Sequence, residues 1–407
     1  MTVTVRECKR EELRYFLETC ETTFLWQFHE QDLPRWERLI DPARLVCAFD
    51  EEAMVGTGGA YTFSVSVPGG DLPAAGVTLV GVLPSHRRRG VLTQMMRFQL
   101  DDIHRRGEPL AVLWASEAAI YRRFGYGLAT LSVAISADRH GAAFRVKSDP
   151  VGRTRLLSEE EAAKVLPAVY ERVRKQIPGM FSRSEEWWKY LRLPDPEYER
   201  EGAGPTYRVV WENEGDAGAY ALYRAKHSWE DGLPASKLEV REVVALDGIP
   251  TREIWRFLFG VDLMARVESR LLPADTSLLH LMAEPRRLRL GLHDGLWLRI
   301  VDIQAALSER SYAADGSLAF AFEDELCSWN SGTWRLSASG GMGELNKVDD
   351  APELTLDAAA LGSVYLGGFS FAELARAGRI TEHVAGAIAR ADALFRTDRA
   401  PWCPQVF

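Results

Sequence analysis

Residues 77–126 constrain the fold of this 407-residue chain more than any other stretch. Val77–Val82 is apolar and rich in β-branched side chains, as expected of a buried strand, and Pro84 ends it. Three arginines and Gly90 follow, and the apolar residues over 91–103 then recur with a nearly helical period. The pattern predicts a strand, a basic glycine turn and an amphipathic helix.

The basic turn has the features of an anion site. A glycine turn that opens a helix presents unpaired backbone N–H groups at the positive end of the helix dipole. Arg87, Arg88 and Arg89 add positive charge at the same point. An arginine run by itself is more often a solvated turn, but this one lies between a buried strand and an amphipathic helix. We therefore predict a polyanion site here, with a diphosphate as its ligand.

The stretch continues with a buried strand, Leu110–Ala115, and a short helix, Ser116–Arg123. Phe124, Gly125, Tyr126 and Gly127 then form an aromatic glycine turn. Seen without its context, Tyr126 is most simply a packed aromatic side chain.

Composition excludes several classes of protein. The net charge is −9 and the isoelectric point is near 5.6, which disfavours nucleic-acid binding. The five cysteines are scattered without a C-x-x-C pair, and no H-E-x-x-H occurs among the eight histidines, so we expect no disulfide framework and no metal site. No apolar run is long enough to span a membrane, and the N-terminus lacks a signal-like apolar core. We expect a cytoplasmic protein.

The basic turn resembles the acyl-CoA signature of the GNAT superfamily of acetyl-CoA-dependent N-acetyltransferases. The pattern Q/R-x-x-G-x-G/A is matched by residues 87–92, except that Leu92 replaces the final small residue. That departure is found mainly in the Eis (enhanced intracellular survival) type. HRRRGVL followed by ASEAAIYRRFGYG is very similar to the Eis type, and the ordered combination is a strong signal.

The resemblance implies a mixed α/β (α+β) chain of tandem GNAT folds followed by a sterol-carrier-protein-like domain. Residues 237–260 repeat the plan of the opening stretch, with a buried strand, a turn and a helix capped by Thr251, but they lack the arginine cluster. We therefore expect a GNAT domain over 1–145 and a degenerate second copy over 146–295. The pattern changes after Leu296, and 296–407 is expected to be the third domain, a scaffold and assembly surface.

Acetyl-CoA is the co-substrate that the resemblance implies. The backbone of the splayed strand should pair with the pantetheine amide and polarise the thioester, and the basic turn should hold the pyrophosphate. Ser116 and Glu117 should border the cofactor arm by family position. The expected cofactor-binding residues are Val80, Gly81, Val82, Arg87, Arg88, Arg89, Gly90, Val91, Leu92, Thr93, Ser116 and Glu117.

Two groups are expected to move protons. A tyrosine after a glycine in this turn is the general acid of many GNAT enzymes, which implies that role for Tyr126. The last residues, APWCPQVF, are apolar and contain two prolines, so we expect them to dock in a groove. Packing alone could explain such docking. The resemblance to Eis implies that the C-terminal carboxylate of Phe407 is the general base.

Aromatic residues near the N-terminus are candidates for the acceptor site. Phe24, Trp26 and Trp36 lie among several acidic residues, a combination that suits an amine-bearing cation. They could equally pack helices onto the sheet. The resemblance implies a multi-amine acceptor such as an aminoglycoside, or a protein lysine, and assembly into a homohexamer. The alternative function is a non-catalytic CoA-binding or lipid-carrier protein.

Overall fold

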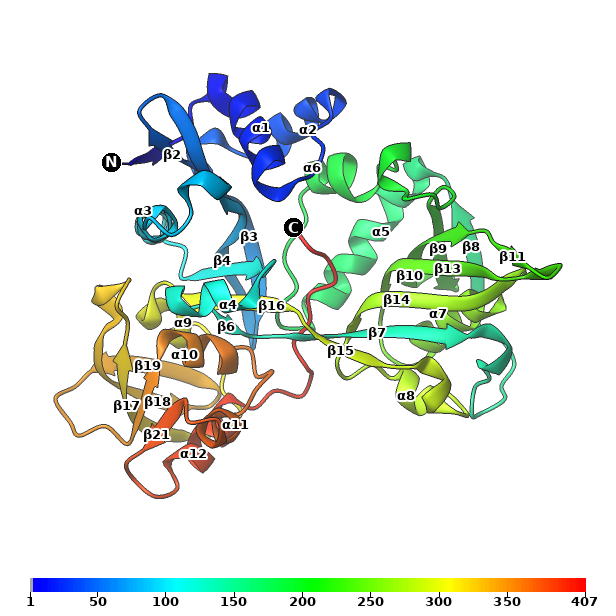
Figure 1. Cartoon of the computed structure of the whole chain (residues 1–407). Coiled ribbons are helices and arrows are strands. Elements are labelled where there is room, and N and C mark those ends of the chain that lie inside the picture. The colour runs from blue at the N-terminus through cyan, green and yellow to red at the C-terminus, as the bar shows by residue number, and fades with distance from the viewer. Residues whose placement is uncertain (1–2) are drawn as a thin grey trace. The chain divides into compact units, whose positions relative to one another are not determined.

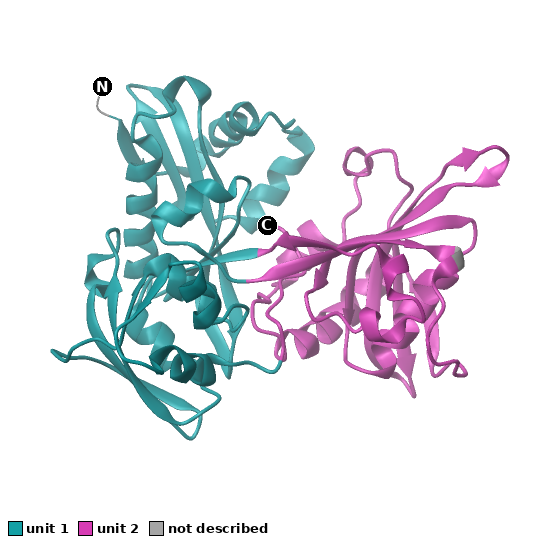
Figure 2. Ribbon diagram, turned by 60° about the horizontal axis from the view of Figure 1, so that its bottom comes forward, with its two compact units in different colours: residues 1–129, 296–398, 407 teal, residues 130–295, 399–406 magenta. Residues whose placement is uncertain are grey.

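The computed structural model describes residues 3–407 and divides into two compact units (Figure 2). One unit comprises residues 1–129, 296–398 and Phe407, and the other comprises residues 130–295 and 399–406. The mixed α/β class predicted from the sequence is observed in both.

The first unit contains a seven-stranded sheet of order β1-β2-β3-β4-β5-β16-β6 (Figure 1). Only the β4–β5 pair is parallel. The strands are β1 (Thr4–Glu7), β2 (Leu45–Asp50), β3 (Ala53–Val67), β4 (Gly70–Val82), β5 (Leu110–Trp114), β16 (Leu296–Ile300) and β6 (Gly127–Leu128). The accompanying helices are α1 (Leu13–Phe24), α2 (Leu33–Leu39), α3 (Val91–Arg105) and α4 (Ala118–Tyr121).

Strands β4 and β5 separate partway along their length. Their parallel pairing joins Ala74–Gly76 to Leu110–Val112, and the rest of β4 is paired with β3 alone. Leu79 has φ +55°, and the β3–β4 register shifts at this point, which marks a bulge in β4. The Thr57 hydroxyl donates to the Leu79 carbonyl at 3.0 Å and holds the bulge. The result is a gap between the carboxyl ends of β4 and β5.

The second unit repeats this plan with a sheet of order β15-β7-β14-β13-β10-β9-β8. Its strands are β15 (Gly291–Asp294), β7 (Leu131–Asp138), β14 (Met264–Pro273), β13 (Ser236–Ala245), β10 (Asp216–Lys226), β9 (Tyr207–Asn213) and β8 (Arg153–Leu157). The helices include α5 (Glu159–Arg174), α6 (Glu185–Trp187), α7 (Ile249–Gly260) and α8 (Leu278–Leu281). Gly248 is the N-cap of α7, whereas the Thr251 hydroxyl donates to the Leu246 carbonyl, so the predicted Thr251 cap is wrong.

Two strands pair with a sheet other than the one their position in the expected domains predicts. Strand β7 follows β6 closely along the chain but pairs with β14 and β15 of the second sheet. Strand β16 follows β15 but inserts between β5 and β6 of the first sheet. Alternating polarity identifies a strand without naming its neighbour, so the sequence could not reveal this exchange.

The rest of the first unit is a five-stranded sheet of order β19-β18-β17-β20-β21 with four helices. The strands are β17 (Gly316–Glu323), β18 (Gly332–Ser339), β19 (Met342–Lys347), β20 (Leu354–Asp357) and β21 (Ile380–Glu382). The helices are α9 (Ile303–Ser308), α10 (Ala358–Val364), α11 (Phe371–Arg376) and α12 (Ala387–Phe395).

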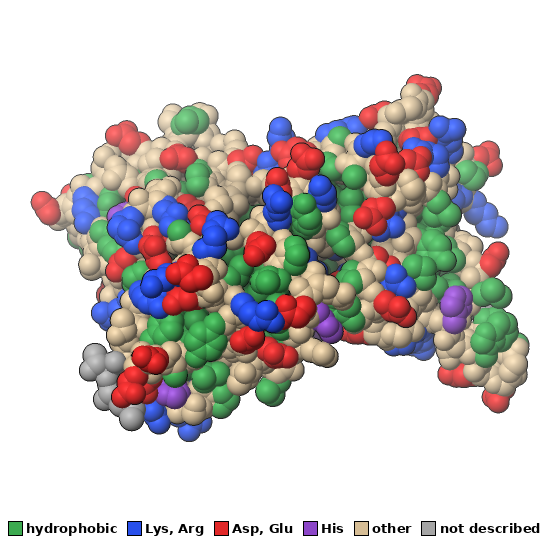
Figure 3. All heavy atoms as spheres, turned by 90° about the horizontal axis from the view of Figure 1, so that it is seen from above, with side chains coloured by type: hydrophobic (Ala, Val, Ile, Leu, Met, Phe, Trp, Pro, Cys, Tyr) green, Lys and Arg blue, Asp and Glu red, His purple; other side chains and the backbone are tan. Residues whose placement is uncertain are grey.

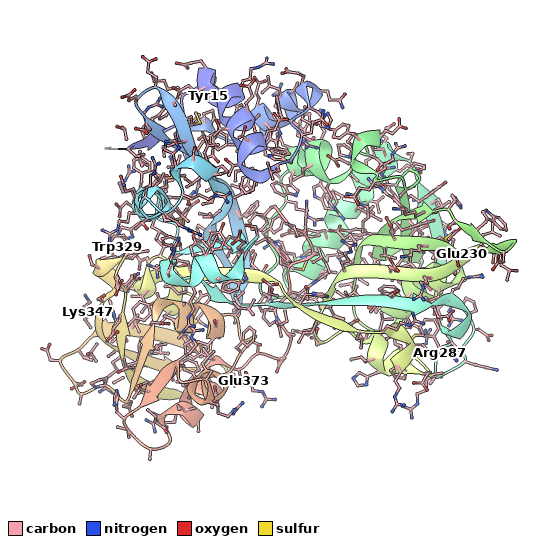
Figure 4. The ribbon with its side chains drawn as sticks, in the orientation of Figure 1. Tyr15, Glu230, Arg287, Trp329, Lys347 and Glu373 are labelled. Atoms are coloured by element: carbon pink, nitrogen blue, oxygen red, sulfur yellow. The ribbon has the colours of Figure 1, made fainter. Side chains whose placement is uncertain are left out.

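This region packs directly on the first sheet. A Cβ on Gly127 would lie 1.9 Å from the Ala359 carbonyl oxygen, so α10 approaches the backbone of β6 as closely as a glycine permits. Trp329, which is labelled in Figure 4, stacks on His104 near the end of α3, and their ring centroids are 4.3 Å apart. The third domain is therefore part of the support of the first sheet.

Because β16 forms part of the first sheet, a substitution on this strand should lower the stability of the protein even though β16 is distant in sequence from the first domain. We expect Leu298→Ala, fully buried on β16, to destabilise the protein by about 2–5 kcal/mol because it leaves a cavity. Leu292 on β15 is 64% exposed, so Leu292→Ala is the matched control, with an expected change within about 0.5 kcal/mol. Thermal and urea unfolding measure both. Equal effects would contradict a core role for β16.

Candidate active site

The basic turn presents a helix N-terminus without a side-chain cap. Gly90 is the N-cap of α3, with φ +79°, and a Cβ placed on it would meet nothing within 4 Å. The Gln94 N–H donates to the Gly90 carbonyl, so the backbone N–H groups of Val91, Leu92 and Thr93 precede the helical ladder. The space beside Gly90 is open, and a helix N-terminus with unpaired N–H groups is a geometry that binds phosphate.

The three arginines lie on this exposed turn. Arg87 Nε donates to the Val82 carbonyl at 3.2 Å, which ties the turn to the end of β4. Arg88 has φ +61°, a conformation that non-glycine residues rarely adopt and that is concentrated at functional sites. The predicted polyanion residues are thus brought together at the N-terminus of α3.

The gap between β4 and β5 is bordered by the other expected cofactor residues. Val80 packs against the core under α3, and Val82 is buried beside Val91. A Cβ on Gly81 would lie 2.2 Å from Thr23 Cγ2 and 3.3 Å from Phe24 Cζ, so only glycine fits beneath the end of α1. Ser116 and Glu117 are exposed beyond the end of β5.

Tyr126 lies inside the core on the α3 side of the sheet. The side chain is fully buried, its ring meets Tyr121 edge to face at 6.1 Å, and no hydrogen-bond partner for its hydroxyl is found within residues 3–407. Burial raises the pKa of the phenol well above its usual range, opposed by the nearby Arg299 guanidinium. The Tyr126 hydroxyl is therefore protonated at neutral pH, and its O–H donor is not used by any protein group among the described residues.

Arg299 is a residue of this site that the sequence reasoning missed. It is fully buried on β16, where its Nη2 donates to Asp324 Oδ1 at 2.6 Å. A Cβ on Gly125 would lie only 2.0 Å from Arg299 Nη1, so the guanidinium packs directly beneath the turn that carries Tyr126. The sequence shows an arginine within the apolar run Leu296–Ile300, which indicates a buried charge. It does not show that this arginine contacts the turn at Gly125.

Phe407 packs on the opposite face of the same sheet. Its ring is 5.0 Å from Phe63 and 6.5 Å from Tyr61, both edge to face, and the side chain is half-buried. Tyr61 and Phe63 were not among the predicted site residues. Their alternation along β3 was visible in the sequence, but their contact with the chain terminus was not.

The register of β3 and β4 separates the two candidate proton-moving groups. Ala60 opposes Val77 and belongs to the cluster around Tyr126, whereas Tyr61 opposes Gly76 on the other face, toward Phe407. Neighbouring residues of a strand point to opposite faces. Tyr126 and Phe407 therefore lie on opposite sides of the sheet, at the region where β4 leaves β5.

Of the predicted acceptor aromatics, Phe24 lies on the same side of the first sheet as Phe407. Phe24 is 39% exposed and covers Gly81, and Trp26 meets Trp36 edge to face at 6.2 Å. Glu30 is paired with Arg14, and Asp32 lies 3.7 Å from Arg35, so these carboxylates are partly neutralised. The nearby aromatic rings are thus better candidates for contacting a cation than those two acids.

The wider surface carries no dominant charge on the face seen in Figure 3, where acidic and basic side chains are interspersed. Within residues 3–407, no helix is long and apolar enough to cross a bilayer, and no group of three or more His, Cys, Asp or Glu side chains is placed to hold a metal ion.

Comparisons with known proteins agree with this geometry. Residues 4–129 and 179–300 each match a family described as an acetyltransferase (GNAT) domain, and residues 303–404 match a sterol carrier protein domain. The predicted tandem GNAT and sterol-carrier-like architecture is confirmed.

Relatives extend the match over the whole chain. An uncharacterized N-acetyltransferase of Streptomyces avermitilis is 40% identical, with both chains covered in full. The N-acetyltransferase Eis of Mycobacterium tuberculosis is 34% identical over 80% of this chain and 79% of that protein. The solved structure of Eis1 from Mycobacterium abscessus superimposes with a TM-score of 0.87 at 33% identity, both chains being covered in full. The chain belongs to the Eis family of GNAT N-acetyltransferases.

Proposed function

We propose that this enzyme transfers the acetyl group of acetyl-CoA directly to an amine, with Tyr126 as general acid and the Phe407 carboxylate as general base. The observation that carries the proposal is the gap between β4 and β5, with a neutral phenol on one side of the sheet and the chain terminus on the other. An attacking amine and a departing thiolate need their proton acceptor and proton donor at opposite ends of the reacting centre.

The chain offers acetyl-CoA a fitting site. Acetyl-CoA supplies the thioester that is the acetyl donor. The uncapped N–H groups of Val91, Leu92 and Thr93, with the three arginines, would hold its pyrophosphate. The unpaired edge of Val80–Val82 would pair with the pantetheine amide and orient the thioester carbonyl.

The Phe407 carboxylate would accept the proton of the acceptor ammonium. An α-carboxyl has a reference pKa of roughly 3.3–3.7 and is ionised at neutral pH, so it attracts the ammonium and receives its proton, directly or through water. Packing of the Phe407 ring on Phe63 and Tyr61 supports this role because it fixes the terminal residue.

Tyr126 would donate its proton to the thiolate. The raised pKa keeps the phenol protonated, and the Arg299 guanidinium beneath the turn stabilises the phenolate that forms. The hydroxyl is enclosed in the free protein, and the Tyr126 side chain lies in the buried cluster that contains Met96, Leu100 and Phe124.

The acceptor we propose is a molecule with several amines, such as an aminoglycoside, or a protein lysine. The exposed ring of Phe24, which covers Gly81, and the edge-to-face pair of Trp26 and Trp36 support a cationic acceptor. Release of CoA in the presence of acetyl-CoA and a panel of polyamines and aminoglycosides tests the reaction. Acetyl-CoA binding without CoA release from any amine would contradict it. Assembly as a homohexamer is part of the proposal, tested by light scattering.

The position of the arginines on the basic turn predicts that removing one positive charge weakens the binding of acetyl-CoA. We expect Arg88→Gln to raise the Kd of acetyl-CoA about tenfold or more, because a charge-assisted phosphate contact contributes roughly 1.5–3 kcal/mol. Arg97→Gln is the matched control, since Arg97 is exposed on the same helix two turns farther on. Calorimetric titration measures both, and equal Kd values would remove Arg88 from the site.

Loss of the Tyr126 hydroxyl should affect the rate and not the fold. We expect Tyr126→Phe to lower kcat by about 10²–10⁴, with unchanged stability because the hydroxyl has no partner to leave unpaired. Tyr121→Phe, on the neighbouring ring, should retain most activity. Wild-type turnover in Tyr126→Phe would show that another group protonates the thiolate.

Removing the terminal charge should have a comparable effect. We expect a semisynthetic protein with a Phe407 carboxamide to lose about 10²–10⁴ in kcat, because the amide cannot accept a proton at neutral pH. The control is a protein made by the same semisynthesis that carries the ordinary Phe407 carboxylate. Full activity of the carboxamide would exclude the terminal carboxylate as base.

A further inference from the structure

The second GNAT domain has the same gap as the first, in the same place. Parallel pairing of β13 with β14 ends at Val240 and Ser269, and both strands continue beyond it. The turn 246–248 and helix α7 follow β13, as the basic turn and α3 follow β4. By topology, this gap is the counterpart of the cofactor gap, without the arginines.

The C-terminal tail occupies this second gap. A cavity of about 130 Å³ is lined by Val243 near the end of β13, Leu272 near the end of β14 and Trp255 of α7. Arg399 and Trp402 of the tail complete its wall. Trp402 is 3% exposed, and its indole N–H donates to the Leu271 carbonyl of the unpaired part of β14 at 3.1 Å.

Further contacts hold the tail on both sides of Trp402. Arg399 Nη1 donates to Asp247 at 2.8 Å, and the Ala400 N–H donates to Asp275 at 3.1 Å. The Trp402 N–H donates to the Pro178 carbonyl at 2.8 Å, and the Trp187 indole N–H donates to the Gln405 side chain at 3.1 Å. Every residue over 401–405 is buried, and Val406 is the first exposed one.

The anchor ends close to the proposed base. Residues 399–406 belong to the second unit, while Phe407 packs within the first. From Gln405 to Phe407 an extended chain spans only about 7 Å. Fixing each backbone residue costs conformational entropy, so a tail that is already ordered up to Gln405 leaves only Val406 and Phe407 to be fixed at the terminus. Pro401 and Pro404 reduce this cost further.

We propose that the gap of the second GNAT domain, which lacks the phosphate-binding arginines, is the anchor of the C-terminal tail, and that Arg399 and Trp402 are positioning residues for the Phe407 carboxylate. The inference rests on the proposed function for the role of Phe407, but the anchor itself does not. The second domain thereby acquires a role in catalysis without binding acetyl-CoA.

The test uses the full-length double variant R399Q/W402F, which removes the ion pairs and the indole N–H while keeping an aromatic ring. The matched control is R172Q/W211F in the same unit, because Arg172 pairs with Asp216 and the Trp211 indole N–H donates to the Val151 carbonyl, away from the tail. We expect carboxypeptidase A to release Phe407 at least tenfold faster from the tail variant than from the control, and kcat to fall by roughly 10²-fold. The Kd of acetyl-CoA should be equal in both.

Release and kcat equal to those of the control would overturn the anchor. Faster release with unchanged kcat would overturn the positioning role. Failure of the base assignment is detected separately, by full activity of the wild-type carboxamide, while the release assay still reports on the anchor. Should the double variant not fold, Asp275→Ala removes the carboxylate that accepts from Arg399 and Ala400 at a partly exposed site, and the same two measurements apply.

Discussion

The separation of β4 from β5 is the constraint on which the rest of the first unit depends. A parallel pair that ends at Gly76 leaves one edge of β4 without backbone partners, and such groups need a hydrogen-bond partner or solvent. The Leu79 bulge and Gly81 make the separation possible, because they turn the strand and admit the end of α1. Proteins place ligands at such openings at the carboxyl ends of strands, and the uncapped α3 lies beside this one.

The same opening occurs twice in the chain, and the two copies differ in what lies in them. The first is bordered by arginines and solvent-exposed residues, which suits a diphosphate. The second contains the chain's own tryptophan and arginine. A duplicated fold thus keeps the strand geometry while its chemistry diverges, since the gap follows from strand pairing and its occupant depends on a few side chains.

Much of the fold was readable from local pattern. The strand, turn and helix over 77–105 and the repeat of that plan near α7 follow from short-range periodicity and turn chemistry. Residues 80–82, 87–93 and 116–117 were predicted as one site; they lie on the end of β4, on the turn and first turn of α3, and just beyond β5, and their role stays a prediction. Arg299, Tyr61 and Phe63 were not predicted, because each reaches the candidate site only through a contact with a residue far away in sequence.

The sequence by itself determined the family, the basic turn and the repeated GNAT plan, since these depend on residues within a few turns of each other. Tertiary structure alone decided the exchange of β7 and β16, the burial of Tyr126 over Arg299, and the place of the tail in the second gap. The partner of a strand, the burial of a charge and the docking of a chain terminus all depend on contacts between residues far apart in sequence. They depend on which apolar and polar surfaces meet when the sheets assemble, and no local pattern encodes that meeting.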